Sequence, residues 1–151
     1  MSVFKQTIIY MDNCCFNRPY DNQSNERIRL ESEAKMYIQD LIKQGEFTLV
    51  WSFILDFENN ANPIKERKKT IAEWRSVASL YVAANDEVRI LANKIQNQTK
   101  LKSKDSLHIA SALSVKSKYL LTTDKKMLKS KIDGICIINP VDYVLVLHEE
   151  N

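Results

Sequence analysis

The sequence predicts an α/β fold built on a parallel sheet, and three observations support this. Four short runs are almost continuously apolar and rich in β-prone residues, as is typical of strands buried on both faces. Segments between these runs repeat apolar residues at helical spacing. Only two glycines and three prolines occur, which argues against flexible linkers. Strands that alternate with helices form parallel sheets with right-handed crossovers.

The predicted strands cover residues 7–11 (TIIYM), 47–51 (FTLVW), 119–122 (YLLT) and 135–138 (ICII). The predicted helices cover residues 25–44, 52–60, 63–81, 86–98, 103–117 and 141–147. Both sets follow from periodicity, because buried strands are short and continuous in hydrophobicity, whereas helices repeat their apolar face every three or four residues. On the helix 63–81, Trp74 and Tyr81 would lie on the same face. This face could pack in the core or form an interface, and we expect it to pack in the core.

Several helix ends have recognisable signals. Gly45 is expected to end the helix at residues 25–44, because glycine is favoured just beyond a helix C-terminus. Ser52 is a suitable N-cap for the next helix. Pro63 fits the first helical position of the third, and Asn139 with Pro140 fits the cap and first position of the last.

Length and composition indicate one soluble domain over residues 1–151. Apolar residues make up 44% and charged residues 27% of the chain, as in ordinary globular proteins. No apolar run approaches the roughly 20 residues that span a bilayer. The N-terminal stretch has only a short apolar run and no small-residue cleavage site, so a cytoplasmic protein without membrane contact is expected.

The three cysteines form no regular framework. Cys14 and Cys15 are adjacent and Cys136 is distant, so the pattern fits reduced thiols with structural or incidental roles. Neither a CxxC pair nor a His/Cys cluster is present, which argues against a zinc site.

Positive charge is concentrated in one segment. Residues 94–131 contain ten lysines and only two acids, whereas residues 1–93 carry 12 basic and 13 acidic side chains. A basic stretch with two isolated acids suits a polyanion that approaches a metal site. The alternative is a solvated lysine-rich surface without a ligand.

Four acidic residues are expected at one edge of the sheet. Asp12 directly follows the first predicted strand, and Asp124 follows the third within two residues. Glu58 lies about two turns into the helix after the second strand, and Asp105 lies in the first turn of the helix before the third. Ligands of parallel α/β folds bind beyond the carboxyl ends of the strands, near the point where the strand order reverses.

Such a cluster indicates a divalent metal. Close carboxylates repel one another and need a cation, and hard oxygen ligands select Mg²⁺ or Mn²⁺ rather than zinc. Bound Mg²⁺ keeps several waters, accepts a phosphate oxygen and can activate a water for attack on a phosphodiester. Each carboxylate alone has an ordinary structural explanation: strand-end aspartates form turns and caps, and Asp105 could compensate its helix dipole.

Four segments carry a resemblance to a known family: IIYMDNCCF, SFILDFENN, KDSLHIASAL and LLTTDKKML. With them the chain, from Ile8 to about Val146, resembles the PIN domain and, within it, the VapC-like toxins of bacterial and archaeal toxin–antitoxin pairs. DSLHIASA at residues 105–112, with TTD at 122–124 downstream, is the most specific part. The resemblance implies a PIN-like three-layer α/β/α sandwich around a four- or five-stranded parallel sheet.

The resemblance also implies roles for individual residues. Asp12, Glu58, Asp105 and Asp124 would be catalytic, and the three aspartates would bind Mg²⁺ or Mn²⁺. Thr122 fits a hydroxyl often found two residues before the last aspartate, where it could bond a metal-bound water or a phosphate.

Some positions remain open at this stage. The family commonly carries Ser, Thr or Asn two residues after the first aspartate, but this chain has Cys14, and a thiol is a poor partner for Mg²⁺. Either Asn13 supplies the missing polar contact or the activity is weak. Asp56 replaces Glu58 if the helix register is shifted by two. His108 is expected to be a structural histidine rather than a proton-transfer residue.

The function predicted by this resemblance is a metal-dependent endoribonuclease that hydrolyses RNA and acts as the toxin of a type II toxin–antitoxin pair. Its implied partners are the RNA substrate, a small cognate antitoxin protein and a second copy in a homodimer. The alternative is a catalytically silent PIN-like module that binds RNA or a protein. A phosphatase of the haloacid-dehalogenase type is disfavoured, because its second aspartate would stand where this chain has Cys14.

Overall fold

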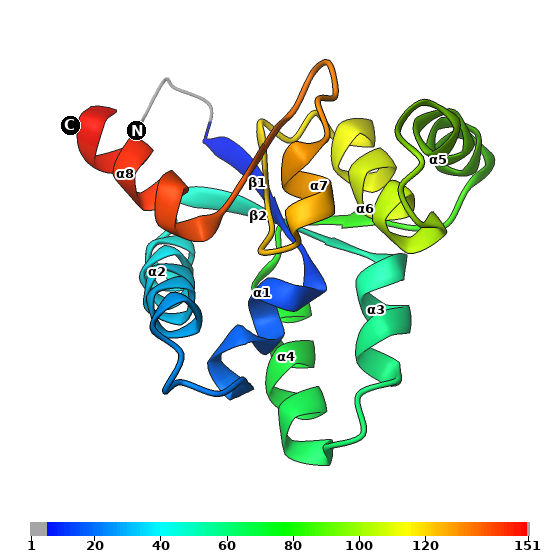
Figure 1. Cartoon of the computed structure of the whole chain (residues 1–151). Helices are drawn as coiled ribbons and strands as arrows, with labels where there is room; N and C mark the ends of the chain where they lie inside the picture. Colours follow the sequence, from blue (N-terminus) through cyan, green and yellow to red (C-terminus); the bar gives the residue numbers. More distant parts are fainter. Residues whose placement is uncertain (1–5, 151) are drawn as a thin grey trace.

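A computed structural model describes residues 6–150, whereas residues 1–5, which begin the stretch inspected for a signal peptide, and residue 151 lie outside it. The described part confirms the predicted α/β fold, with a five-stranded parallel sheet between layers of helices (Figure 1). Among the described helices, none combines the length and the apolarity that a membrane span needs.

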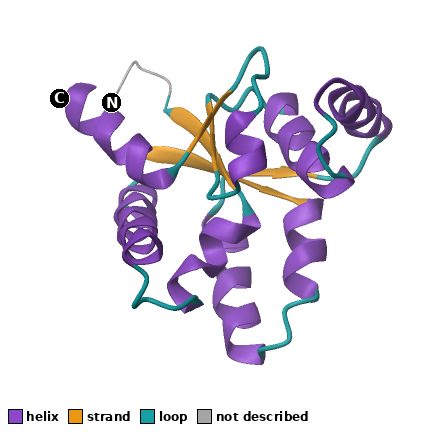
Figure 2. Cartoon of the chain, viewed as in Figure 1, coloured by secondary structure: helices purple, strands orange, loops and turns teal. Residues whose placement is uncertain are grey.

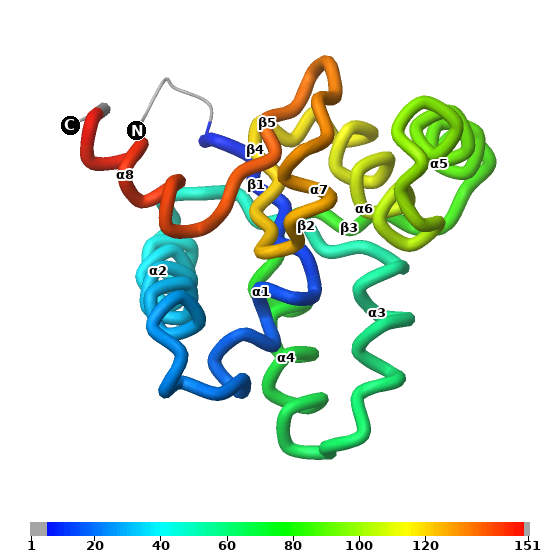
Figure 3. Tube along the Cα trace, viewed as in Figure 1, coloured from blue at the N-terminus to red at the C-terminus, as the bar shows by residue number. Residues whose placement is uncertain are grey.

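The sheet reverses its winding direction once, next to its first strand. Its strands are β1 (Thr7–Met11), β2 (Phe47–Ser52), β3 (Leu80–Val82), β4 (Tyr119–Leu121) and β5 (Cys136–Ile138). Their spatial order is β3-β2-β1-β4-β5, so the chain winds outward from β1 to β3 and then returns to the opposite side of β1. Figure 3 shows β4 beside β1 at this reversal. The switch point, where ligands bind in such sheets, therefore lies between β1 and β4.

The direction of winding also decides which face each helix covers. The helices are α1 (Asn13–Asn17), the 3₁₀ helix η1 (Arg18–Tyr20), α2 (Glu26–Lys43), α3 (Phe53–Asn60), α4 (Lys65–Val77), α5 (Asp86–Thr99), α6 (Ser103–Ser114), α7 (Lys125–Lys129) and α8 (Pro140–Glu150). Right-handed crossovers in opposite directions place their helices on opposite faces. In Figure 2, α1, α2 and α4 accordingly lie below the sheet, and the paired helices α5 and α6 lie on the other side.

Aromatic and aliphatic side chains from both layers bury the middle strands. Tyr10 of β1, Trp51 of β2 and Leu120 of β4 are almost completely buried. Phe16 of α1 meets the Trp51 ring edge to face at 5.3 Å between centroids. This packing holds the carboxyl ends of β1, β2 and β4 in fixed relative positions, and those ends carry the predicted site.

The predicted helix from Pro63 to Tyr81 is wrong at both ends. Helix α4 begins only at Lys65, after Ile64 as N-cap, and ends at Val77. Tyr81 instead lies in β3, a strand absent from the prediction. The error has a physical cause, because β3 has three residues at the sheet edge and the Tyr81 side chain is 45% exposed, so no buried apolar run marks it. Trp74 does belong to the core, as expected.

Candidate metal centre at the carboxyl edge of the sheet

Asp12 stands at the switch point of the sheet. It follows β1 directly and caps α1, where its Oδ1 accepts a hydrogen bond from the Asn13 N–H at 2.6 Å. Its own N–H donates to the carbonyl of Leu121 at 2.9 Å, which ties the end of β1 to the end of β4. The residue is only 6% exposed. Burial of an ionised carboxylate is costly unless positive charge or hydrogen-bond donors compensate it.

Thr122 holds the second oxygen of Asp12. Its hydroxyl, which is completely buried, donates to Asp12 Oδ2 at 2.9 Å and accepts from the N–H of Asp124 at 3.0 Å. A hydroxyl has a single proton. Because that proton is donated to Asp12, the structure gives Thr122 the role of positioning this carboxylate and the turn that follows β4.

Glu58, rather than Asp56, faces Asp12. The Oε1 atom of Glu58 bonds to His108 Nε2, and the same nitrogen lies 3.4 Å from Asp12 Oδ1. Asp56 points elsewhere, where it accepts from Trp51 Nε1 at 2.7 Å and from the Tyr81 hydroxyl at 2.8 Å. The register of α3 thus brings Glu58 to the site and leaves Asp56 in a structural contact.

His108 is fully buried between these acids, and both of its ring nitrogens are bonded. Its Nδ1 lies 2.5 Å from the Tyr10 hydroxyl, which in turn lies 2.6 Å from Ser52 Oγ. This series of hydrogen bonds is compatible with both charge states of His108. If His108 is neutral, the Tyr10 hydroxyl donates to its Nδ1; if His108 is an imidazolium, the Tyr10 hydroxyl accepts from Nδ1 and donates to Ser52. Burial alone would lower the pKa of His108, but the nearby Asp12 and Glu58 carboxylates outweigh it and raise the pKa.

The hydrogen bonds made by His108 agree with its expected structural character, but its location does not separate it from the site. The side chains of Asp12, Glu58 and His108 each offer a ligand atom, and these atoms all lie within 4.8 Å of one another. His108 lies three residues after Asp105 on α6, and residues at that spacing share a helix face. That spacing was the signal in the sequence that pointed to a place for His108 beside Asp105.

Asp105 lies in the first turn of α6 and is half-buried. Burial, together with the charges of Asp12, Asp124 and Glu58, raises its pKa from 3.8 to about 6 against the opposing effect of His108. Charge–charge effects of this kind act over short distances. Asp105 therefore lies within the electrostatic range of the other three predicted carboxylates.

Asp124 has a structural task as well. It is the N-cap of α7, and its Oδ1 accepts from the N–H groups of Lys126 at 2.8 Å and Met127 at 3.1 Å. Since both hydrogen bonds go to Oδ1, Oδ2 of Asp124 is the oxygen left to bind a metal ion. The cap fixes the direction in which this carboxylate points.

The two residues after Asp12 make different contacts. Asn13 Oδ1 is buried and has no hydrogen-bond partner among the described residues. Cys14 Sγ lies 3.4 Å from both Asp12 Oδ2 and Thr122 Oγ1, and it accepts from the N–H of Thr123 at 3.3 Å. Cys14 thus takes the place of a small polar side chain beside Asp12, and Asn13 offers an acceptor that a water could satisfy.

The donor set fits a hard divalent cation. Carboxylate oxygens dominate, and burial together with the neighbouring carboxylates raises the pKa of Asp105. The cluster of possible ligands found among residues 6–150 differs from the predicted metal set, because it joins Asp12 to Glu58 and His108. An imidazole nitrogen in this position is tolerated better by Mn²⁺ than by Mg²⁺.

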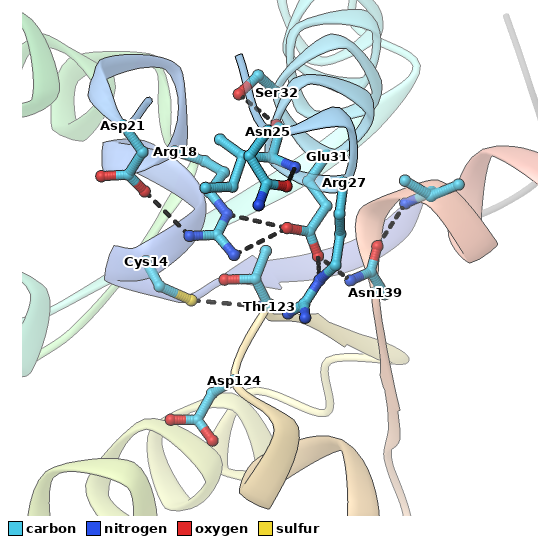
Figure 4. A network of polar contacts seen from close by, with 12 residues as sticks. Cys14, Arg18, Asp21, Asn25, Arg27, Glu31, Ser32, Thr123, Asp124 and Asn139 are labelled. Atoms are coloured by element: carbon cyan, nitrogen blue, oxygen red, sulfur yellow. Dashed lines mark hydrogen bonds and ion pairs between the residues drawn. The ribbon is translucent and has the colours of Figure 1, made fainter. Parts of the chain in front are cut away.

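A separate ion network is centred on α2 (Figure 4). Glu31 is buried, yet both of its oxygens are engaged: Arg18 binds Oε1 with two nitrogens at 2.9 Å, and Asn139 Nδ2 donates to Oε2 at 2.5 Å. Arg27 adds a contact at 3.6 Å. This network joins η1, α2 and the start of α8, and Figure 4 shows it above the loop that carries Thr123 and Asp124.

Comparison with known proteins reveals similarity in fold only. No protein-family model matches the sequence, and no curated protein matches it. A chain in the crystal structure of VapBC2 from Rickettsia felis, bound to a DNA fragment from its promoter, superposes with a TM-score of 0.56 at 12% identity, covering 88% of this chain and 98% of that chain. A chain of DNA-bound VapBC from Salmonella typhimurium gives a TM-score of 0.57 at 16% identity, covering 89% and 99%. The likeness agrees with the predicted PIN-like architecture.

Proposed function

We propose that this chain is a Mg²⁺- or Mn²⁺-dependent endoribonuclease and the toxin of a type II toxin–antitoxin pair. The convergence of Asp12 and Glu58 at His108 is the observation that carries the proposal. Asp105 lies one turn before His108 on α6, and the charges of Asp12, Asp124 and Glu58 help to raise its pKa. These carboxylates lie at the switch point of the sheet, where α/β folds bind ligands. The shared fold with two VapBC structures supports the assignment to toxins.

In this proposal Asp12, Asp105 and Asp124 hold the metal, and Glu58 completes the acidic set. When bound, the divalent ion neutralises the phosphate and supplies an acidic water for hydrolysis of the phosphodiester. Asn13 Oδ1, which lacks a partner within the described part of the chain, is the acceptor for a water in the site.

The remaining residues fix the carboxylates in place. Thr122 and the Asn13 N–H bind the two oxygens of Asp12. His108 binds Glu58 and is itself held by the Tyr10 hydroxyl. A group held in this way needs little reorganisation when the substrate arrives, which is a main source of catalytic rate.

Two substitutions at the acidic cluster test the activity. We expect Asp12→Asn and Asp105→Asn to lower Mn²⁺-stimulated cleavage of RNA by about 100-fold or more, with the fold retained by circular dichroism. Asp86→Asn is the matched control, because Asp86 lies on α5 and its side chain is 87% exposed. Full cleavage by both cluster variants, after purification from host nucleases, would refute the proposal.

A second pair of variants tests the register of α3. Glu58→Gln is expected to reduce cleavage strongly, whereas Asp56→Asn should leave most of it, because Asp56 bonds to Trp51 and Tyr81. The reverse order of effects would assign the acidic role to Asp56. Thermal unfolding of both variants separates loss of stability from loss of chemistry.

A catalytically silent module that binds RNA or a protein remains the second candidate, and Cys14 is the observation that favours it. Its thiol occupies the place beside Asp12 Oδ2 where an oxygen would serve a metal site better. Cleavage by highly purified wild-type protein that is stimulated by Mn²⁺ and abolished by Asp12→Asn would exclude this candidate.

We further propose a small antitoxin protein as partner and a homodimer as the oligomeric state. The antitoxin is supported by the shared fold with chains of VapBC complexes. Co-expression with the product of the neighbouring gene, followed by co-purification and a cleavage assay, tests the antitoxin. Light scattering of the purified protein tests the dimer, and a monomer mass at all concentrations would exclude it.

A further inference from the structure

Lysine side chains gather in two hollows near the ends of α5 and α7. The larger hollow, of about 440 Å³, lies between the end of α5 and α7 and includes Lys100, Lys126 and Lys129. The smaller, of about 250 Å³, includes Lys94. Both hollows are lined by Gln98 and Lys131, so they form one continuous surface. We call this surface the lysine groove.

The lysine groove carries positive charge that no neighbouring acid neutralises directly. All five of its lysines are exposed, and none takes part in the ion pairs that join the described residues. Asp133 is the one acid that lines either hollow within the described part. Unpaired lysines on a concave surface attract a polyanion, because their charges add and each keeps its ammonium group available.

Two residues that line the lysine groove are close in sequence to acids of the site. Lys126 is two residues beyond Asp124 and donates its N–H to the Asp124 carboxylate at 2.8 Å. Leu101, which also lines the larger hollow, lies four residues before Asp105. A backbone whose phosphates lie in this groove would thus bring a neighbouring phosphate to the acidic cluster.

An exposed aromatic ring stands on another side of the cluster. Phe57 of α3 is 60% exposed although it immediately precedes Glu58. Lys104, which immediately precedes Asp105, holds its Nζ 5.3 Å from the centre of the Phe57 ring. An exposed ring next to an ammonium group is a common platform for a nucleobase, because every base can stack on it whatever its sequence.

From these two features, and resting on the function proposed above, we infer that the chain holds single-stranded RNA along a track. Lysines of the groove bind backbone phosphates on one side of the acidic cluster, and Phe57 stacks an unpaired base on another. Bases of a duplex are already paired and stacked, so they could not use this ring. The recessed position of Asp12 also favours a flexible single strand, which can bend a phosphate into the site.

Binding measurements on a cleavage-deficient background test the groove. With Asp12→Asn present throughout, we expect Lys126→Gln/Lys129→Gln to weaken binding of fluorescein-labelled single-stranded RNA about tenfold at moderate salt. The slope of log affinity against log salt should decrease by about 0.7 for each phosphate contact removed. Lys65→Gln/Lys69→Gln on α4 is the matched control, since these lysines are exposed and lie outside the groove. If the two double variants weaken RNA binding equally, the lysine groove is not the RNA-binding surface.

A second variant tests the ring. On the same background we expect Phe57→Ala to weaken binding of single-stranded RNA about tenfold without changing the salt slope, because stacking involves no ion release. Phe57→Tyr should restore the affinity. Binding of double-stranded RNA should be insensitive to either change. If Phe57→Ala binds as tightly as the parent, or if duplex RNA is bound more tightly than single strands, the proposed track is wrong.

These measurements separate the track from the catalytic proposal. Binding that depends on the groove, together with no cleavage by the wild-type protein, would support the track and refute the ribonuclease. Cleavage that is abolished by Asp12→Asn but unaffected by both the groove and the ring variants would support the ribonuclease and refute the track. A single-stranded DNA probe bound more tightly than RNA of the same sequence would overturn the choice of RNA.

Discussion

Asp105 bears an electrostatic cost within the acidic cluster, and this predicts how the stability depends on pH. Burial and the charges of Asp12 and Asp124 raise its pKa from 3.8 to about 6. Between these two values the folded state keeps a proton that the unfolded state has lost, so this residue reduces stability as pH rises from about 4 to about 6, and the full cost remains above that range. In EDTA at pH 7.5, Asp105→Asn should therefore be more stable than wild type by about 1 kcal/mol, measured by urea unfolding.

The pH series itself provides the control for this prediction. At pH 4 the Asp105 carboxyl of the folded wild type is protonated, and the advantage of Asp105→Asn should disappear. Asp142→Asn, on the exposed first turn of α8, should show no such change between the two pH values. An advantage that is equal at pH 4 and pH 7.5 would mean that charge repulsion is not its source.

Cys14 offers a substitution that should improve the site. Its thiol makes long contacts of 3.4 Å with Asp12 Oδ2 and Thr122 Oγ1. The hydroxyl of Cys14→Ser is a better donor to a carboxylate and a better neighbour for a hard cation. We expect an increase of roughly fivefold in kcat/KM with Mg²⁺, measured with a fluorogenic RNA. Cys14→Ala should lack the gain, and a gain of the same size in Cys14→Ala would point to steric relief instead.

At the level of single residues, position along the strands predicted more than residue type. Asp12 and Asp124 were identified because each follows a buried run, and the structure places both at the carboxyl edge. The choice between Glu58 and Asp56 depended on the direction of a short helix, which periodicity does not resolve. The link from His108 through Tyr10 to Ser52 joins residues 98 and 42 positions apart, so no local pattern could reveal it.

Long elements were predicted better than short ones. Helix α2 begins and ends within one residue of its prediction, because Asn25 caps it and Gly45, with φ of 84°, ends it in the left-handed conformation that glycine adopts easily. The five-residue helices α1 and α7 were not predicted. Each depends on one aspartate cap, Asp12 or Asp124, rather than on an amphipathic pattern. The residues that the site needs are therefore also the ones that shape its short helices.

The end of α6 permits a stabilising change. Lys116 has φ of 56°, and the bonds from Lys116 N–H to Leu113 and from Ser117 N–H to Ala112 form the helix-ending motif in which glycine is preferred. A side chain in this conformation is strained by about 1 kcal/mol. Lys116→Gly should therefore raise the free energy of unfolding by about 0.5–1 kcal/mol, measured by urea titration.

A neighbouring lysine provides the contrast for that change. Lys118 is not among the residues with positive φ, so Lys118→Gly gains no relief and should lower stability by about 0.5–1 kcal/mol through the freedom it gives the unfolded chain. If both variants are destabilised equally, the conformation of Lys116 carries no strain in solution.

At the scale of the whole molecule, the strand order creates the site. Alternation of strands and helices predicted a parallel sheet, but it did not predict the strand order. In the structure β4 pairs with the side of β1 that faces away from β2. Strands of three residues such as β4 and β5 carry too little pattern to specify neighbours, so the order depends on packing between distant segments. That pairing brings Asp12 to Thr122, which lies 110 residues further along the chain. The resemblance to PIN domains implied the parallel sheet and the acidic residues, but not this strand order.

Because the acidic residues come from the end of β1, from α3, from the start of α6 and from the end of β4, the unfolded chain cannot reproduce the site. A divalent ion that binds only the folded state raises its stability by about 2.7 kcal/mol at 100 times its dissociation constant. For a chain of this size we expect the thermal midpoint to rise by about 5–10 °C in saturating Mn²⁺ or Mg²⁺, and EDTA to reverse the rise. NaCl at equal ionic strength should not reproduce it, and Asp12→Asn should remove most of it, since Asp12 is the most buried of the four carboxylates. An identical rise in Asp12→Asn would mean that the cation binds elsewhere, and the metal centre proposed for this edge of the sheet would have to be abandoned.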